Sequence, residues 1–391
     1  MNEKLLQKLS KLNVCVVSHI FASGPALDLE EFLKKKTKRL LFIGHPFPYR
    51  EDRKSFYRLY KTGNLVKEHK AINWKLAEVF FYIKDALYTL LWVGTQKEKV
   101  DLYIGSDNFT AYLGLLLKKW GKVKKVVLYT IDYMENRFQN HVMNYLYHYF
   151  DESCLKECSI VWNVSPAIQE ARLRTTSKQK RWTKQIVVPL GMWHKRIPKR
   201  TFGEKNRHQL VFLGHILEKQ GLDVVLEGLP RVVEKFPKAR LVILGTGPHE
   251  ELLKEKAKKL KIEKYVDFRG YIVDHRLAEN ILAESMIGVA MYKPDPSSFT
   301  YHADPAKLKN YLSARLPIVL TDVPPISIEL ARQKCAVIAK YDREDFAKKT
   351  IKLLRNEKTL KDYEKNADRF AAKFDWDTVF TEALKKTVIT F

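Results

Sequence analysis

The sequence has few cysteines and none of the short motifs that mark common metal or nucleophile chemistry. Its 391 residues include four cysteines, and no two of them form a Cys-x-x-Cys pair. This spacing excludes a disulfide framework and favours reduced, buried thiols in a cytoplasmic protein. The motifs His-Glu-x-x-His and Gly-x-Ser-x-Gly and the Walker phosphate loop are absent. Zinc hydrolysis, an α/β-hydrolase nucleophile and P-loop chemistry are therefore not expected.

Long apolar runs are missing as well. No stretch reaches the roughly 18 uncharged apolar residues expected of a membrane-spanning helix, and the run that starts at Val79 is interrupted by Lys84 and Asp85. Another run begins directly after Asn13 without a cleavage pattern, which predicts a first strand rather than a signal peptide. We expect a cytoplasmic protein that is soluble or peripheral on the inner face of the cytoplasmic membrane.

Acidic residues are outnumbered by basic ones, 45 to 70, so the net charge is +25. Such an excess attracts polyanions, among them nucleic acids, anionic membrane surfaces and phosphorylated substrates, and does not choose among them. No nucleic-acid-binding motif occurs, so we expect no nucleic-acid partner. Residues 109–125 combine an apolar face with Trp120 and five lysines. They fit a helix in an anionic membrane interface as well as a helix packed on a sheet.

Short apolar runs alternate with amphipathic stretches along the whole chain. The first series includes "VCVVSH", "RLLFIGHP", "VDLYIGSD" and "KVVLYTID", and the second includes "LVFLGH", "ARLVILGTGP" and "LPIVLTD". This pattern predicts α/β domains with parallel sheets covered on both faces. The basic, proline-bearing segment 191–209 predicts a linker. We therefore expect one domain over residues 1–200, a second over 201–374 and a further helix over 375–391.

Polar residues and glycines follow most of these strands, where doubly wound sheets bind ligands. The candidates in the first domain are Ser18, His19, Gly24, His45, Asp107 and Asp132. Those in the second are Gly214, His215, Gly245, Gly247 and Tyr271. The pattern favours a structural role over a catalytic one for the two histidines. Asp132 fits either a polar group of the site or a helix or turn cap.

Two features of the second domain are typical of phosphate binding. The loop that begins at Gly214 contains Lys219 and leads into a helix, which suits a phosphate as well as a plain connection. The segment "FTYHADPAKLKNYLSARLPIV" predicts a helix with Asp304 as N-cap and Pro305 at its first position, and its N–H groups would attract an anion. Gly245 and Gly247 lack the rest of a dinucleotide fingerprint, so no nicotinamide cofactor is expected.

These segments resemble the retaining glycosyltransferase family 4, also called glycosyl transferases group 1. "LVFLGHILEKQGLDVVLEGLP" is similar to its Gly-Arg…Lys-Gly loop, and "DPAKLKNYLSARLPIV" to its "P-x-K-x-x-E-Y-x-A-x-G-x-P-V-V" segment. The resemblance implies the GT-B fold, with two tandem Rossmann-like doubly wound parallel-sheet domains facing across a cleft. It also implies that the helix over 375–391 crosses back to the first domain.

The resemblance implies transfer of a sugar from a nucleotide-diphosphate sugar to a glycan or lipid-linked acceptor, with retention of configuration and without a metal or another cofactor. The donor would bind mainly the second domain, at Gly214, His215, Lys219, Gln220, Gly245, Gly247, Tyr271, Asp304, Ala306, Lys307 and Asn310. The acceptor would bind mainly the first, at Ser18, His19, Gly24, His45 and Asp107. The catalytic candidates are Asp132, as the polar group nearest the anomeric carbon, and His302.

The chain departs from this family at several positions. His215 and Gln220 stand where the family usually has Arg and Lys, which leaves Lys219 one place early. His302 and Asn310 occupy the positions of the Glu-x7-Glu carboxylates. Two hypotheses follow: an enzyme that uses Lys219, Lys307 and Arg315 differently, or a non-catalytic GT-B-like subunit that binds a partner transferase or a glycan.

Overall fold

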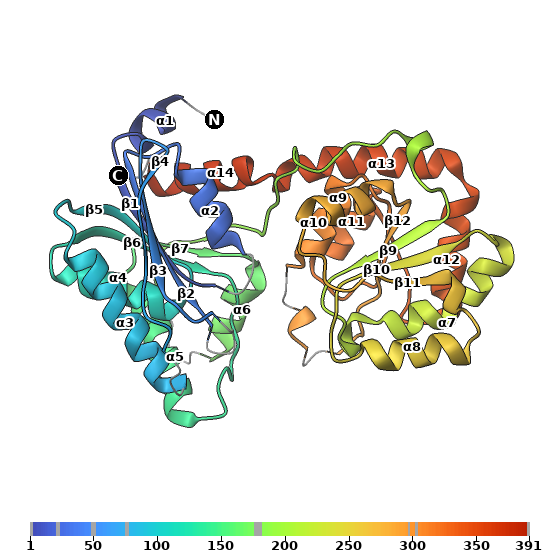
Figure 1. The fold of residues 1–391 in the computed structure, drawn as a ribbon, viewed down its shortest axis with the longest axis horizontal. Coiled ribbons are helices and arrows are strands. Elements are labelled where there is room, and N and C mark those ends of the chain that lie inside the picture. The colour runs from blue at the N-terminus through green and yellow to red at the C-terminus, as the bar shows by residue number, and fades with distance from the viewer. Residues whose placement is uncertain are drawn as a thin grey trace. The chain divides into compact units, whose positions relative to one another are not determined.

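The computed structural model describes residues 3–20, 24–47, 52–74, 78–175, 182–295, 298–301 and 304–388. The chain divides into two compact units (Figure 1). Unit 1 consists of Met1–Pro189 and Trp376–Phe391, and unit 2 of Leu190–Asp375. Each unit is built around one sheet, so the prediction of two tandem α/β domains is confirmed.

The sheet of unit 1 has eight strands in the order β4-β3-β2-β1-β5-β6-β7-β8. The strands are β1 (Asn13–Ile20), β2 (Arg39–Pro46), β3 (Phe56–Lys61), β4 (Asn64–Lys70), β5 (Val100–Gly105), β6 (Val123–Thr130), β7 (Ile160–Asn163) and β8 (Gln185–Val187). From β2 to β8 all neighbours are parallel, whereas β2–β3 and β3–β4 are antiparallel. The hairpin of β3 and β4 turns at Thr62 and Gly63, both at positive φ, as tight hairpin turns require.

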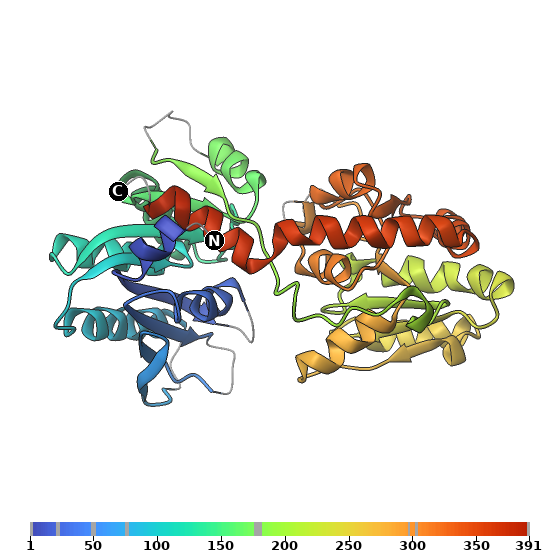
Figure 2. The ribbon, with the colours of Figure 1, turned by 90° about the horizontal axis from the view of Figure 1, so that it is seen from above.

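Helices cover both faces of this sheet (Figure 2). They are α1 (Glu3–Leu9), α2 (Pro25–Leu33), α3 (Glu78–Gly94), α4 (Asn108–Lys119), α5 (His141–Glu157), α6 (Pro166–Thr175) and α14 (Trp376–Val388). Helix α4 packs between α3 and α5, and α14 packs against α1 and α2. The last helix also bonds to the sheet, because Trp162 Nε1 donates to Thr387 Oγ1 at 3.0 Å. It therefore forms part of unit 1.

The placement of α4 decides between the two interpretations of residues 109–125. Leu113, Leu115 and Leu117 are buried, so the helix packs on the sheet, and Trp120 at its end is exposed. Within the described part of the chain, no helix is both long and apolar enough to cross a membrane.

The sheet of unit 2 has six parallel strands in the order β11-β10-β9-β12-β13-β14. The strands are β9 (Gln209–Leu213), β10 (Arg240–Leu244), β11 (Val266–Phe268), β12 (Ile287–Ala290), β13 (Ile318–Leu320) and β14 (Ala336–Ile338). Its helices are α7 (Leu222–Lys235), α8 (Glu250–Lys259), α9 (His275–Glu284), α10 (Ala306–Ser313), α11 (Ile326–Arg332), α12 (Arg343–Arg355) and α13 (Glu357–Ala371).

The core of unit 2 lies on both faces of its sheet. Leu210 and Phe212 belong to one buried cluster and Val211 to the other, which is the alternation of a strand covered on both sides. In both units the strand order reverses at the first strand, between β2 and β5 around β1 and between β10 and β12 around β9. These switch points are where such sheets bind ligands.

Candidate functional site

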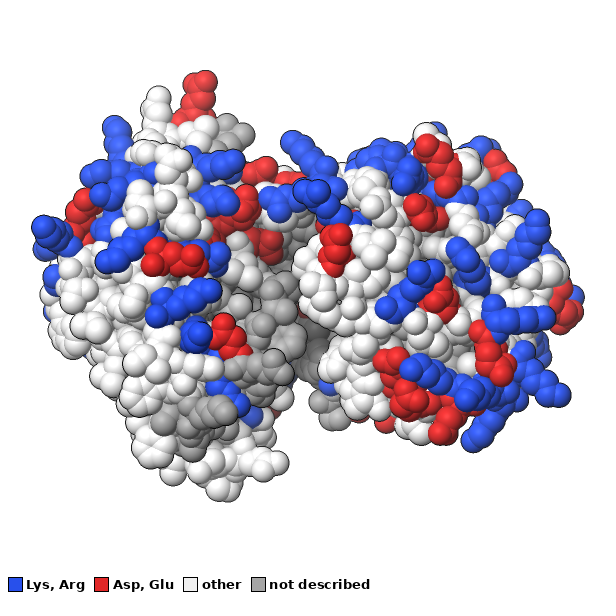
Figure 3. All heavy atoms as spheres, in the orientation of Figure 1, with Lys and Arg blue, Asp and Glu red and all other residues white. Residues whose placement is uncertain are grey.

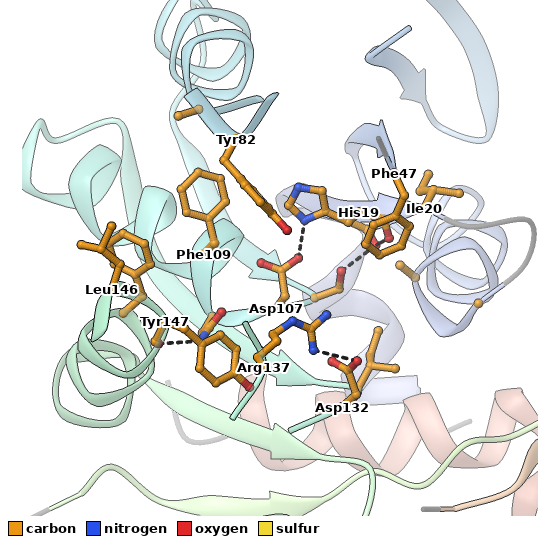
Figure 4. A pocket seen from close by; sticks show the side chains of 18 of the residues that line it. His19, Ile20, Phe47, Tyr82, Asp107, Phe109, Asp132, Arg137, Leu146 and Tyr147 are labelled. Carbon is orange, nitrogen blue, oxygen red and sulfur yellow. Dashed lines mark hydrogen bonds and ion pairs between the residues drawn. The ribbon is translucent and has the colours of Figure 1, made fainter. Parts of the chain in front are cut away.

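Unit 1 has a pocket of about 590 Å³ at the carboxyl ends of β1, β5 and β6 (Figure 4). Most of its wall is apolar, and its polar side chains lie at the strand ends. The pocket brings together five residues that the sequence singled out: Ser18, His19, Gly24, Asp107 and Asp132. The sixth, His45, is not among its lining residues.

His19 lies between two carboxylates. Its Nδ1 is 2.8 Å from Asp107 Oδ2 (Figure 4). Its Nε2 is 3.4 Å from Asp85 Oδ2. Burial disfavours the charged ring, yet Asp107 and Asp85 together raise the pKa of His19 to about 10. The ring is therefore an imidazolium at neutral pH, which can donate hydrogen bonds but cannot act as a general base.

Asp107 is held by two partners. Besides accepting from His19, its Oδ1 accepts from the backbone N–H of Thr110 at 2.7 Å and so caps α4. These bonds keep the pKa of Asp107 below its usual range in spite of burial. The carboxylate thus fixes both the start of α4 and the orientation of His19.

His45 is fully buried behind the pocket wall. Its Nδ1 is 2.9 Å from Ser55 Oγ and its Nε2 is 2.8 Å from Thr89 Oγ1. Since Ser55 donates its proton to Asp85 at 3.0 Å, the Nδ1–H of His45 donates to Ser55. Burial lowers the pKa of His45, so this ring is neutral. The two neighbouring histidines therefore carry different charges.

Sequence reasoning missed Asp85, which supports both histidines. Its side chain is 1% exposed, and its carboxylate also pairs with Lys84 at 2.9 Å. A signal was present, since Lys84 and Asp85 share one helical face with Phe81 and Thr89, all of them buried in α3. Charged residues on the inward face of a helix indicate a buried polar network.

Asp132 follows β6 and faces the pocket. Arg137 lies opposite it and was not among the residues predicted from the sequence. The side chain of Asp132 is 63% exposed, and its Oδ2 accepts from Arg137 Nη1 at 2.9 Å (Figure 4). The carboxylate is thus engaged in an ion pair and caps no helix. Such an exposed ion pair contributes little to stability. Asp132 can therefore release Arg137 and bind a ligand instead.

A pH series tests the charge of His19. A raised histidine pKa adds stability that is complete below the unfolded value, about 6.5, and is lost as the pH rises through about 10. His19→Asn should therefore lower the free energy of unfolding most at pH values near 6, and the deficit should shrink toward the alkaline end. Urea unfolding measures it, with exposed His141→Asn as the control. A deficit independent of pH would contradict the assignment.

In unit 2, Lys307 lies near two glycines, Gly214 directly after β9 and Gly245 directly after β10. Gly214 and Gly245 have φ angles of +135° and +138°, which side-chain-bearing residues rarely adopt. A Cβ on Gly245 would lie 1.9 Å from Gly214 O, and one on Gly214 would lie 3.2 Å from Lys307 Nζ. Glycine at both positions therefore lets the two strand ends and the lysine approach one another.

Lys307 is a buried lysine that pairs with no carboxylate of the described residues. Its Nζ donates to Gln220 Oε1 at 2.6 Å and lies 3.9 Å from the centre of the Phe212 ring. Among the described residues no carboxylate pairs with it, and burial lowers its pKa well below the usual range. Because α10 starts at Ala306, the unbonded N–H groups typical of a first helical turn lie beside this lysine. Lysine, helix start and glycine loop together suit an anion.

The predicted N-cap role of Asp304 is wrong. The N-cap position is Pro305 and has no side-chain cap, and α10 begins at Ala306. Asp304 instead accepts from the backbone N–H of Leu190 at 2.9 Å and pairs with Lys309. Lys309 is fully buried. Leaving its charge without a carboxylate would cost more free energy than leaving the start of α10 without a side-chain cap.

The other predicted donor residues lie at various places around this site. Gln220 is buried and bonds Lys307, whereas His215 and Tyr271 are exposed. Lys219 is half-buried in the loop after β9, and a Cβ on Gly247 would strike the backbone of Ile216. Asn310 donates to Ala306 O at 3.2 Å. Arg315 follows the opposite end of α10, where it pairs with Asp368 at 2.9 Å, and His302 lies outside the described residues.

Part of the chain is similar to known proteins. Residues 194–370 match the family model of glycosyl transferases group 1. A stretch of 72 residues is 33% identical to an uncharacterized glycosyltransferase of Haemophilus influenzae. That match spans 18% of this chain and 20% of the relative.

Solved structures share the fold over nearly the whole chain. HepE of Anabaena, crystallised with UDP, has a TM-score of 0.64 at 12% identity, covering 97% of this chain and 100% of that one. Sucrose-phosphate synthase of Thermosynechococcus elongatus has a TM-score of 0.67 at 12% identity, with 97% and 99% covered. The chain therefore shares the fold of these two glycosyltransferase structures, and its residues 194–370 match the family model of glycosyl transferases group 1.

Proposed function

We propose that this protein moves a sugar from a nucleotide-diphosphate sugar to a glycan or lipid-linked acceptor, with retention of configuration. The observation that carries the proposal is the buried Lys307, which pairs with no carboxylate of the described residues and lies beside Gly214 and the start of α10. A diphosphate gains negative charge as the glycosidic bond breaks, and a lysine with helix N–H groups stabilises that charge. HepE, which shares the fold, was crystallised with UDP.

The reaction as proposed needs no metal ion, because Lys307 and the first turn of α10 supply the positive charge. Burial lowers the pKa of Lys307 well below the usual range, so the side chain holds its proton less firmly than an exposed lysine does. A bound diphosphate would favour the protonated lysine and raise its pKa. Donor binding would therefore be coupled to the protonation of Lys307.

Unit 1 would hold the acceptor in its pocket. His19 and Asp107 satisfy each other, so we assign a polar contact with the acceptor to Asp132, whose carboxylate is exposed and pairs with Arg137. A carboxylate there would stabilise positive charge developing on the anomeric carbon. We place this chemistry in the cytoplasm, with the acceptor at the inner face of the membrane.

A donor panel tests the proposal. A UDP-, GDP-, ADP- or TDP-sugar at 100 times its dissociation constant should raise the free energy of unfolding by about 2.7 kcal/mol. We expect one base to stand out in thermal unfolding, and the corresponding radiolabelled sugar to be transferred to a membrane extract. The nucleoside without phosphates is the control, because the proposed site recognises the diphosphate. No stabilisation by any donor would contradict the proposal.

A second candidate is a non-catalytic GT-B-like subunit that binds a partner transferase or a glycan. Asn310 favours it, because its amide bonds to Ala306 O where the resembling family has a carboxylate. In that case a donor would stabilise the protein without any transfer. Activity would then appear only in a co-purified complex.

A further inference from the structure

Helix α3 buries two charged residues and exposes a row of apolar ones, which is unusual for a surface helix. Its charged residues Lys84 and Asp85 point inward and are buried, whereas Phe80, Ile83 and Leu87 are among its exposed residues. The exposed apolar residues recur every three or four positions and continue to Leu91, so they form one stripe. A stripe of this length facing solvent indicates a surface that something apolar covers.

Helix α5 extends this apolar surface. Val142, Tyr145, Leu146 and Tyr149 are exposed on it, and uncharged side chains predominate over α3 and α5 in Figure 3. Ile72 and Trp74, which follow β4 in the sequence, are exposed as well, and so is Lys70. We call the α3 stripe and the exposed apolar residues of α5 the apolar face.

The apolar face is continuous with the pocket. Ile83 and Leu87 of α3 and Leu146 of α5 are exposed, and all three also line the pocket. Polar groups of the pocket, among them His19, Asp107 and Asp132, lie at the strand ends. A ligand that satisfies both parts needs a hydroxyl-bearing head and an apolar chain. A folded partner or a second copy would cover the face and leave the pocket unfilled.

Charge points to the same occupant. The protein carries a net charge of +25, and exposed lysines of β4, among them Lys67 and Lys70, precede Ile72 and Trp74. Basic residues beside an exposed tryptophan and aliphatic side chains are typical of surfaces that lie on anionic bilayers. Both the apolar side chains and the charge thus match a membrane.

We propose that the apolar face lies on an anionic lipid bilayer and that the pocket receives a lipid-linked acceptor directly from it. This inference rests on the proposed function for the identity of the acceptor. The contact with lipid itself needs neither donor nor transfer.

Vesicle binding tests the face. Leu87→Glu should weaken sedimentation with phosphatidylglycerol–phosphatidylcholine vesicles by about tenfold or more, because a leucine leaves the acyl region. Leu252→Glu on α8 is the matched control, since Leu252 is 58% exposed, Leu87 is 63% exposed, and the charge changes equally. Binding should also survive salt that screens surface charges. Equal loss in both variants would overturn the proposal in favour of simple electrostatic attachment.

A second variant tests the pocket. Ala86 lines it, so Ala86→Trp should fill its mouth, abolish transfer to a lipid acceptor, and leave vesicle binding and donor stabilisation intact. Wild-type protein that binds vesicles but no donor would contradict the proposed function alone. Wild-type protein that is stabilised by a donor but ignores vesicles would overturn this inference alone. If the wild-type protein does not bind vesicles but forms a dimer, and Leu87→Glu dissociates that dimer, a second copy covers the face.

Discussion

Replacing Lys307 by methionine should raise the free energy of unfolding and abolish donor binding. The unfolded lysine is protonated at neutral pH, whereas the folded side chain is buried and its pKa lies well below the usual range. Burying the ammonium group therefore carries a cost that methionine avoids. Methionine leaves Gln220 Oε1 without its donor at 2.6 Å, which costs about 1 kcal/mol. We expect a net gain of about 1–2 kcal/mol, within the range seen for buried charges replaced by apolar groups.

The gain should depend on pH. The unfolded lysine binds more protons than the folded one at every pH up to its ordinary value, about 10.4. The advantage of Lys307→Met is therefore largest at neutral and acidic pH and disappears as the pH approaches 10.4. Urea unfolding of both proteins at several pH values measures it.

Function should change in the opposite direction. Without the ammonium group, stabilisation by a nucleotide-diphosphate sugar should vanish, and any transfer should fall by about a hundredfold or more. The exposed Lys348→Met is the control, because it removes the same charge from α12, away from the glycine loop. A Lys307→Met protein that is more stable and still binds the donor would contradict the phosphate site.

The fold could be predicted from the sequence because its strands are buried on both faces. Such strands appear as short apolar runs, and the runs quoted from both halves coincide with parallel strands of the two sheets. The antiparallel hairpin of β3 and β4 was not predicted. Every residue of β4 is exposed, so no hydrophobic pattern marks it.

The candidate site was predictable only at the strand ends. Topology places Ser18, Asp107 and Asp132 in one pocket once the sheet is parallel, whatever their side chains contact. Helical spacing could indicate that Asp85 is buried, but its contact with His19 and the contact of Arg137 with Asp132 depend on the tertiary structure. Asp304 shows the same limit, because a buried lysine one turn later competes for its carboxylate.

Arg172 is another residue that only the tertiary structure reveals, and Arg172→Met should lower the free energy of unfolding by about 3–5 kcal/mol. Its side chain is 1% exposed, and its Nε and Nη2 donate to the two carboxylate oxygens of Asp151 at 2.8 and 2.6 Å. Further bonds reach Asn163 Oδ1 at 2.8 Å and Thr130 Oγ1 at 2.9 Å. One guanidinium thus joins α5, α6, β6 and β7, and methionine would leave Asp151 buried without a partner.

The control lies two residues further along α6. Arg174 is exposed and 3.7 Å from Glu135, so Arg174→Met should change the free energy of unfolding by less than about 1 kcal/mol. Urea unfolding of the two variants compares a buried ion pair with a surface one in the same helix. Equal effects would contradict the structural role of Arg172.

The cost of Arg172→Met should come from the abandoned carboxylate rather than from lost packing. If so, adding Asp151→Leu should recover most of the stability, because the double variant buries no unpaired charge. Arg172 also bonds Thr130, two residues before Asp132, so Arg172→Met should displace Asp132 and slow transfer. Stabilisation by a donor should persist, because the donor would bind unit 2. A double variant as unstable as the single one would instead assign the cost to the lost bonds with Asn163 and Thr130.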